Sequence, residues 1–361
     1  MNILIVSGFF YPTNTPRAFR TVELAKRFVR MGHKVTVCIP ETNYDYSEFL
    51  SHYPMVIKTY KKKLERRIFT GVSLLDRIIY RAMIQFLDYP DKYIVKAVYK
   101  TLKNEIGYDV LISIAVPHEI HWGIGLIYKE GIRLAKSWIA DCGDPFMLKE
   151  SGNYKPMFYF KKYEKLWCRL CDYIAVPTEA SKNGYYPEFR TKIRVIPQAF
   201  DFDEIETLPY RPNEIPTFAF SGSFIKGLRD PRPILDYLTK SKKKFKAIFY
   251  TMQPGFFSTY KSTANQQIIV KEYIPRLELL KELSQMDFLL NIANGNVTSQ
   301  TPSKLIDYAL TKRPILTVSS LDVDTSLIDE FMSGDYSRQH IVPNLEQYDI
   351  KNVANQFLSL I

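Results

Sequence analysis

The sequence predicts an α/β protein made of two doubly wound parallel sheets, and three observations lead to this fold class. Short apolar runs alternate with amphipathic helical patterns along most of the chain, which is typical of a parallel sheet with helices on both faces. The length of 361 residues exceeds what one hydrophobic core usually organises. A proline-rich break near residue 200 separates the alternation into two series.

The first series opens with a strand at 3–6, a helix at 16–31 and a second strand at 34–39. The helix carries apolar residues at helical spacing, and Gly32 is suited to end it. Further strand-like runs occur at 110–115, 137–140 and 173–176. We therefore expect an N-terminal, Rossmann-like domain over residues 1–196.

The acidic and proline-rich stretch 197–216 is interpreted as a linker. Five apolar runs follow it, at 218–220, 246–250, 268–270, 288–292 and 315–318. They predict a second domain over residues 217–344, and we expect the last helical pattern, within 345–361, to pack back on the first domain. Two α/β domains predict an interdomain cleft, which is a common place for ligands.

The segment 301–308 joins two of these strands and has the features of an anion-binding helix start. Thr301 is a suitable N-cap and Pro302 a suitable first helical residue. The N–H groups near Ser303, the helix dipole and the charge of Lys304 would favour a diphosphate. Asp307 shares a helical face with Lys304 and could accept hydrogen bonds from a ribose. The alternative is an ordinary capped helix with solvated charges.

Two loops after strands also carry small and basic residues. The first, 7–17, contains Gly8 and Arg17 and is a candidate phosphate or sugar contact, but it lacks the three-glycine pattern of NAD and FAD sites. The second, 221–231, contains Gly222, Lys226 and Arg229. Arg229 and Lys304 together would form a two-cation clamp for a diphosphate. Because no convincing Asp-x-Asp metal site is present, we expect the clamp in place of a metal.

The net charge is +11, and much of it lies between Lys58 and Lys103, a range that contains 12 basic and 4 acidic residues. Apolar and aromatic residues are interleaved with this charge, which is typical of a surface for an anionic membrane. A solvated helical face is the alternative, and no nucleic-acid motif accompanies the charge. The four cysteines fit a reduced, cytoplasmic compartment, and we interpret the Cys168–Cys171 pair as core packing within a helix at 163–173.

Six stretches of the chain resemble the GT-B glycosyltransferases, specifically family-4-like enzymes of bacterial surface-polysaccharide pathways. They occur in the order of that family and extend over nearly the whole chain. The matching stretches are 3–6 with the following loop and helix to 35, 138–146, 172–178, 194–201, 220–231 and 303–316. The resemblance implies a retaining sugar transfer from a nucleotide-sugar donor, without a metal or further cofactor. It also implies a saccharide or lipid-linked saccharide acceptor, and a peripheral position at the inner membrane face.

The resemblance also implies roles for individual residues. Ser303, Lys304 and Arg229 would hold the donor diphosphate, Asp307 the ribose, and Tyr273 and Ile274 the base. His118 and His121 follow the strand at 110–115, where a histidine of the family reaches the donor sugar or the reacting centre, and His121 fits the family spacing better. Asp141 and Asp144 would flank the acceptor, and Glu119 is a further candidate base.

The chain departs from the family pattern at three positions. Asp307 stands where the family usually has Glu, Ser299 stands where it has a second Glu, and Ser223 stands where it often has Arg. Two other functions remain open from the sequence. A nucleotide-sugar epimerase shares the architecture, and a non-enzymatic polyanion-binding protein would explain the charge.

Overall fold

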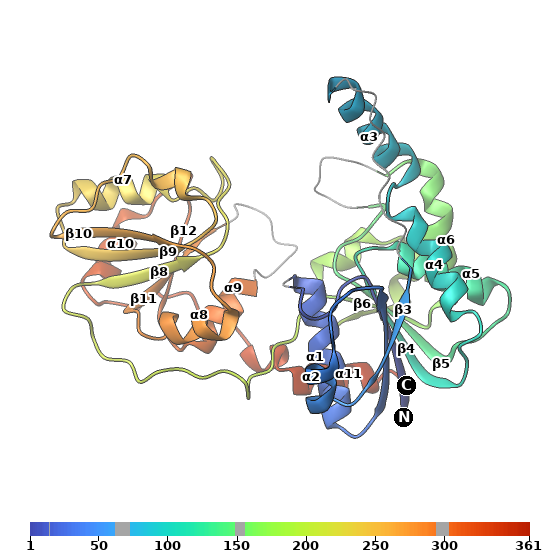
Figure 1. Cartoon of the computed structure of the whole chain (residues 1–361). Coiled ribbons are helices and arrows are strands. Elements are labelled where there is room, and N and C mark those ends of the chain that lie inside the picture. The colour runs from blue at the N-terminus through green and yellow to red at the C-terminus, as the bar shows by residue number, and fades with distance from the viewer. Residues whose placement is uncertain (14, 62–72, 149–155, 294–302) are drawn as a thin grey trace. The chain divides into compact units, whose positions relative to one another are not determined.

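The computed structural model describes residues 1–13, 15–61, 73–148, 156–293 and 303–361 (Figure 1). The chain forms two compact units. Unit 1 comprises Met1–Phe200 together with Tyr348–Ile361, and unit 2 comprises Asp201–Gln347. The last helix of the chain thus belongs to the unit that contains the N-terminus.

Unit 1 contains a seven-stranded sheet in the order β3-β2-β1-β4-β5-β6-β7, and every neighbouring pair is parallel. Its strands are β1 (Asn2–Ser7), β2 (Lys34–Pro40), β3 (Val56–Tyr60), β4 (Tyr108–Ala115), β5 (Ala135–Cys142), β6 (Tyr173–Val176) and β7 (Ile193–Val195). The strand order reverses between β1 and β4. Loops that leave the carboxyl ends of two such strands flank a crevice in doubly wound sheets, and this position suits ligands.

Helices cover both faces of this sheet, because successive residues of β1 enter different cores. Ile3 and Ile5 pack in the cluster that contains α1 (Pro16–Arg30) and α11 (Ile350–Leu358). Leu4 and Val6 pack in the cluster of α4 (Lys92–Leu102), α5 (Glu119–Lys129) and α6 (Lys161–Leu170). The remaining helices are α2 (Ser47–His52), α3 (Ser73–Leu87) and the short 3₁₀ turns η1 (Phe158–Phe160), η2 (Ala180–Gly184) and η3 (Pro187–Lys192).

Unit 2 contains a five-stranded parallel sheet in the order β10-β9-β8-β11-β12. Its strands are β8 (Thr217–Ser221), β9 (Phe245–Tyr250), β10 (Gln266–Lys271), β11 (Phe288–Ile292) and β12 (Ile315–Val318). Its helices are α7 (Arg232–Lys240), α8 (Arg276–Leu283), α9 (Ser303–Leu310) and α10 (Thr325–Met332), with 3₁₀ turns η4 (Pro254–Phe257) and η5 (Leu345–Tyr348). The reversal here lies between β8 and β11, which brings the start of α9 to the loop that follows β8.

The two parallel sheets confirm the predicted fold class, and the differences lie in its details. The sequence did not predict β3, an edge strand with little apolar alternation, or the three-residue β7. Helix α6 ends at Leu170, and Cys168 and Cys171 are both buried in the core of unit 1, as predicted. Among the residues described, no helix is long and apolar enough to cross a bilayer.

Candidate functional site

The side-chain ammonium of Lys304, in the first turn of α9, is buried, and none of the described residues forms a hydrogen bond with it. The nitrogen lies 4.5 Å from the centre of the Phe220 ring, which supplies a cation–π contact in place of hydrogen bonds. Burial, followed by the nearby charge of Arg229, lowers the pKa of Lys304 to about 7. A buried amine beside a second cation is suited to receive an anion.

The ring beneath Lys304 belongs to an aromatic layer at the end of β8. Phe220 stacks on Phe224, with ring centres 4.6 Å apart. The next residue, Ser221, donates its backbone N–H to the hydroxyl of Tyr308 at 2.7 Å. Because Tyr308 belongs to α9, this bond fixes the helix that carries Lys304 against the loop that carries Arg229.

Arg229 lies in the loop between β8 and α7, and buried Asp230 organises this loop. The Asp230 carboxylate accepts from the Gly227 backbone N–H at 3.3 Å and from Arg232 Nε at 2.8 Å. The backbone N–H of Arg229 donates to the Ile225 carbonyl at 2.8 Å. Burial lowers the pKa of Arg229, and Tyr273 opposes this effect. The predicted pair of cations is therefore brought together, with Tyr273 close enough to interact.

The other loop residues predicted for this site have distinct surroundings. Gly222 has a φ of +137°, a conformation that side chains disfavour, and its N–H donates to the Tyr250 carbonyl. Lys226 is exposed. Tyr273 is 48% exposed and has a ring available for stacking, whereas Ile274 packs partly into the smaller core of unit 2. The structure thus places Tyr273 with Arg229 and leaves Lys226 in solvent.

Asp307, predicted to hold a ribose, is bound by Arg276. Arg276 Nε and Nη2 lie 2.9 and 2.6 Å from the same oxygen, Asp307 Oδ1. Burial raises the pKa of Asp307, and the charge and hydrogen bonds of Arg276 oppose that rise. Arg276 was not predicted from the sequence, although one signal was available. A cation in the first residue of a helix is unfavourable beside the helix dipole, so its position at the start of α8 calls for an acidic partner.

Ser303 is the first residue of α9, and its side chain lies outside the described residues. The predicted cap, Thr301 and Pro302, and the departure at Ser299 lie outside them as well. The role proposed for the backbone of this helix start therefore stays a prediction.

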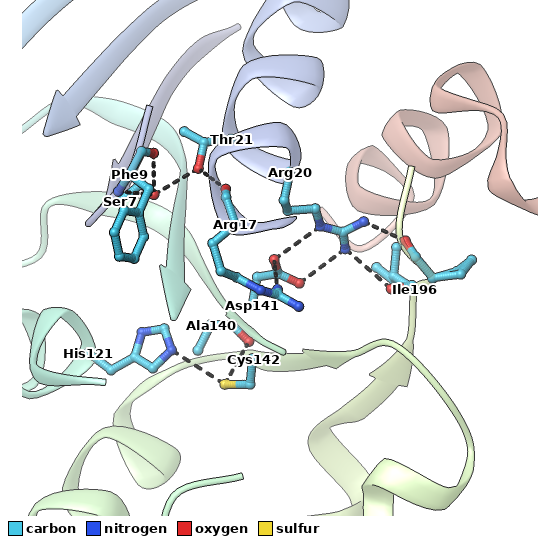
Figure 2. Close-up of polar contacts among 11 residues, drawn as sticks. Ser7, Phe9, Arg17, Arg20, Thr21, His121, Ala140, Asp141, Cys142 and Ile196 are labelled. Carbon is cyan, nitrogen blue, oxygen red and sulfur yellow. Dashed lines mark hydrogen bonds and ion pairs between the residues drawn. The ribbon is translucent and has the colours of Figure 1, made fainter. Parts of the chain in front are cut away.

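In unit 1, the loop after β1 is closed by short polar contacts (Figure 2). Ser7 Oγ donates to the Phe9 carbonyl at 2.9 Å, and the hydroxyl of Thr21 lies 2.7 Å from Ser7 Oγ. A Cβ atom on Gly8 would lie 2.3 Å from Cδ of Pro117, so only glycine fits where this loop crosses the loop after β4. This packing accounts for Gly8 without a ligand.

Two arginines of α1 approach Asp141, at the carboxyl end of β5 (Figure 2). Arg20 Nε and Nη2 lie 3.1 and 3.0 Å from the two Asp141 oxygens, and both side chains are almost fully buried. Arg20 also donates to the carbonyls of Ile196 and Pro197. Arg17 Nη1 lies 3.8 Å from Asp141 and keeps 20% of its side chain exposed. Arg20 is therefore structural, and Arg17 is the arginine that a ligand can reach.

The histidines predicted near the reacting centre are both buried. His121 is 0% exposed, its Nδ1 lies 2.8 Å from Ser113 Oγ, and its Nε2 lies 3.3 Å from Cys142 Sγ. Burial lowers the pKa of His121 well below its usual value. His118 is 3% exposed and lies against Phe146, with ring centres 5.4 Å apart. Aromatic side chains cover both imidazole rings. In this structure, neither ring is exposed to contact a substrate directly.

Two acidic candidates of unit 1 also differ from each other. Asp144 is exposed in the loop after β5, where an acceptor could reach it. Glu119 is buried, and burial followed by a hydrogen bond with Asp88 raises its pKa well above the usual value. A general base must lie within hydrogen-bond reach of the proton that it accepts, and the burial of Glu119 does not favour it in this role, which stays a prediction.

Known structures match this architecture along its whole length. The apo form of a lipopolysaccharide outer core galactosyltransferase, WaaB, gives a TM-score of 0.60 at 10% identity, with 100% of this chain and 99% of that chain covered. A glycosyltransferase from Rickettsia africae gives 0.59 at 12% identity, covering 99% and 97%. The chain has the GT-B glycosyltransferase fold.

The GT-B fold does not by itself define the reaction. A UDP-GlcNAc 2-epimerase from Methanocaldococcus jannaschii matches with a TM-score of 0.53 at 13% identity, covering 100% and 99%. No protein-family model and no curated protein sequence matches the chain. The reaction of this chain therefore depends on its own side chains.

Proposed function

We propose that this GT-B protein is a glycosyltransferase that binds the diphosphate of a nucleotide-sugar donor between Arg229 and Lys304. One observation carries the proposal: Lys304 Nζ is buried, no described residue forms a hydrogen bond with it, and Arg229 is close enough to lower its pKa. Two neighbouring cations repel each other unless an anion lies with them. A diphosphate supplies that anion, and its binding would restore the charged form of Lys304.

The neighbouring residues fit the other parts of a nucleotide. Asp307 Oδ2 is available to a ribose hydroxyl, since both hydrogen bonds from Arg276 go to Oδ1 and no other described residue donates to this carboxylate. The exposed ring of Tyr273, close to Arg229, is suited to stack on a base. Unit 2 thus offers two candidate partners for the diphosphate and one each for the ribose and the base.

In the reaction that we propose, the sugar leaves a nucleoside diphosphate and joins an acceptor hydroxyl with its configuration retained. The C–O bond to the diphosphate breaks as the acceptor oxygen forms its bond on the same face, and the acceptor proton passes to the departing phosphate. Arg229 and Lys304 would stabilise the negative charge that develops on the diphosphate, the task that a divalent metal performs in other enzymes. The retained configuration and the independence from metal rest on the family resemblance.

Unit 1 would supply the acceptor side. Arg17 and Asp144 are two predicted residues there that keep exposed surface. We propose a saccharide acceptor, linked to a lipid, at the anionic inner face of a bacterial membrane. The basic and apolar composition of residues 58–103 supports this choice.

A single assay separates transfer from epimerisation. The protein is incubated with radiolabelled nucleotide sugars, with and without a bacterial lipid-linked saccharide fraction, and free nucleoside diphosphate and labelled lipid are measured. Transfer predicts nucleoside diphosphate release that depends on the acceptor and is lost in Arg229→Ala. Conversion to a second sugar without any acceptor would support the epimerase instead. Binding of polyphosphate or heparin, without binding of any nucleotide, would support the polyanion-binding alternative.

A further inference from the structure

Helix α3 extends from the body of unit 1 (Figure 1). It also exposes large apolar side chains. Leu74 is 63% exposed, Ile78 is 55% exposed and Phe86 is 51% exposed. A 15-residue helix with such side chains in water gains little from burial, and isolated helices of this length are marginally stable. A contiguous exposed apolar surface of this kind indicates a partner.

Most apolar residues of α3 lie on one side of the helix, and Tyr80, Ile84 and Leu87 are the exceptions. At 100° per residue, seven positions fall within one half of its circumference: Leu74, Leu75, Ile78, Ile79, Ala82, Met83 and Phe86. Arg77 and Arg81 lie on the other half, and Arg81 lies about 20° from its edge. Apolar residues bordered by cations are typical of a helix that lies in the interface of a membrane.

A second surface, on η1 and α6, adds a group of cations. Lys161, Lys162, Lys165 and Arg169 line an open pocket of about 420 Å³ together with Phe158 and Tyr159. Phe158 is 78% exposed. Lys165 forms an ion pair with Glu188, so these charged groups together leave a net charge of +3. We call these six pocket residues the basic face.

The basic face and α3 are joined by a direct contact. The hydroxyl of Tyr159 donates to the backbone carbonyl of Phe86, near the end of α3. The exposed ring of Phe158 comes immediately before Tyr159, on the same 3₁₀ turn. Apolar insertion and cation attraction can therefore act on one neighbouring surface.

We propose that α3 and the basic face form one membrane-docking surface, which inserts apolar side chains and binds anionic lipid headgroups. A second copy of the chain is the other candidate for the apolar side of α3. Pairing two copies here would bring two net-positive basic faces and the arginines of α3 together, which is unfavourable. An anionic bilayer instead offers both the hydrocarbon and the opposite charge. The proposal deepens the proposed function, because it names the surface that would bring the enzyme to a lipid-linked acceptor.

Flotation of the full chain with vesicles tests the proposal. We expect binding to vesicles of phosphatidylcholine with about one third phosphatidylglycerol, and much weaker binding to phosphatidylcholine alone. The variant Leu74→Ser/Ile78→Ser tests insertion, and Lys161→Ala/Lys162→Ala/Arg169→Ala tests the basic face. Since each basic residue near an anionic surface changes partition by about fivefold, the triple variant should lose roughly 100-fold.

A matched triple variant controls for net charge. Lys240→Ala/Lys244→Ala/Lys261→Ala removes the same charge from exposed positions of unit 2 and should bind vesicles as the wild type does. Equal losses in both triple variants would overturn the basic face, and unchanged binding of Leu74→Ser/Ile78→Ser would overturn insertion by α3. A concentration-dependent dimer that this double variant abolishes, without any vesicle binding, would assign α3 to a second copy.

Membrane docking can be tested separately from the donor binding proposed above. Nucleoside diphosphate binding, followed by thermal melting, should be unaffected in the docking variants, because they change no residue of unit 2. If the docking variants lose vesicle binding and still bind the nucleotide, the docking surface is supported independently of the donor site. Vesicle binding by a chain that binds no nucleotide would instead refute the donor site and leave the docking surface intact.

Discussion

Arg276 directs two hydrogen bonds at a single oxygen of Asp307, Oδ1. The arrangement holds the carboxylate in one orientation while leaving Oδ2 for a ligand. It also joins α8 and α9, because Arg276 begins one helix and Asp307 lies in the other. The shorter Asp, where the family that the sequence resembles usually has Glu, is thus placed by Arg276.

The titration of Lys304 gives the first prediction. With a pKa of about 7, Lys304 is mostly neutral in the free protein above pH 8, and a bound diphosphate favours its charged form. Binding of a nucleoside diphosphate at pH 8.5 should therefore take up close to one proton. Isothermal titration calorimetry in buffers of different ionisation enthalpy measures this uptake, and Lys304→Met should abolish it. Equal uptake by both proteins would place the titrating group elsewhere.

The same lysine predicts a pH-dependent stability difference. The pKa of Lys304 lies below its unfolded value, so the cost of burying its charge is complete below pH 7 and declines between pH 7 and about 10.5. Lys304→Met should therefore unfold at higher urea concentration than the wild type at pH 6. This advantage, on the order of 2–4 kcal/mol, should shrink as the pH rises towards 10. An advantage that is constant with pH would contradict the assignment.

Arg20 and Arg17 provide a matched pair of substitutions. Arg20→Met leaves the buried Asp141 without its bidentate partner and should reduce the free energy of unfolding by about 3–5 kcal/mol. Arg17→Met removes a partly exposed side chain 3.8 Å from the same carboxylate and should cost about 1 kcal/mol or less. Urea unfolding measures both changes. Similar losses for the two variants would refute the division into a structural and an accessible arginine.

His121 gives a test in the acid range. Because its folded-state pKa lies well below 6.5, the unfolded chain takes up a proton below that pH while the folded protein does not. The free energy of unfolding of the wild type should therefore fall relative to His121→Asn by about 1.4 kcal/mol for each pH unit below 6.5. Urea midpoints between pH 6.5 and 5 give this slope. A parallel pH dependence in the two proteins would show that the buried His121 remains free to ionise.

Periodicity in the sequence was sufficient to predict the fold, because apolar strands and amphipathic helices alternate clearly in both units. It was also sufficient to place Arg229 and Lys304 together, since loops after neighbouring strands of a parallel sheet share one edge. It could not show that His118 and His121 are covered, because the covering groups, Phe146 and Trp167, come from residues far along the chain. The pairing of Arg276 with Asp307 was missed for the same reason, as it joins residues 31 positions apart.

Binding of nucleoside diphosphates to wild type and two variants tests the central claim most directly. Thermal melting is followed with UDP, GDP, ADP and CDP for the wild type, Asp307→Ala and Asp329→Ala. Asp329 forms an ion pair with Lys243 and is a matched control in the same unit. A ligand at about 100 times its dissociation constant adds roughly 2.7 kcal/mol, a shift of about 5–10 °C for domains of this size. We predict that one nucleotide shifts the wild type and Asp329→Ala by this amount and that its effect is blunted in Asp307→Ala. A melting point that no nucleotide moves, or an equal shift in all three proteins, would contradict the donor site at Lys304, Arg229 and Asp307.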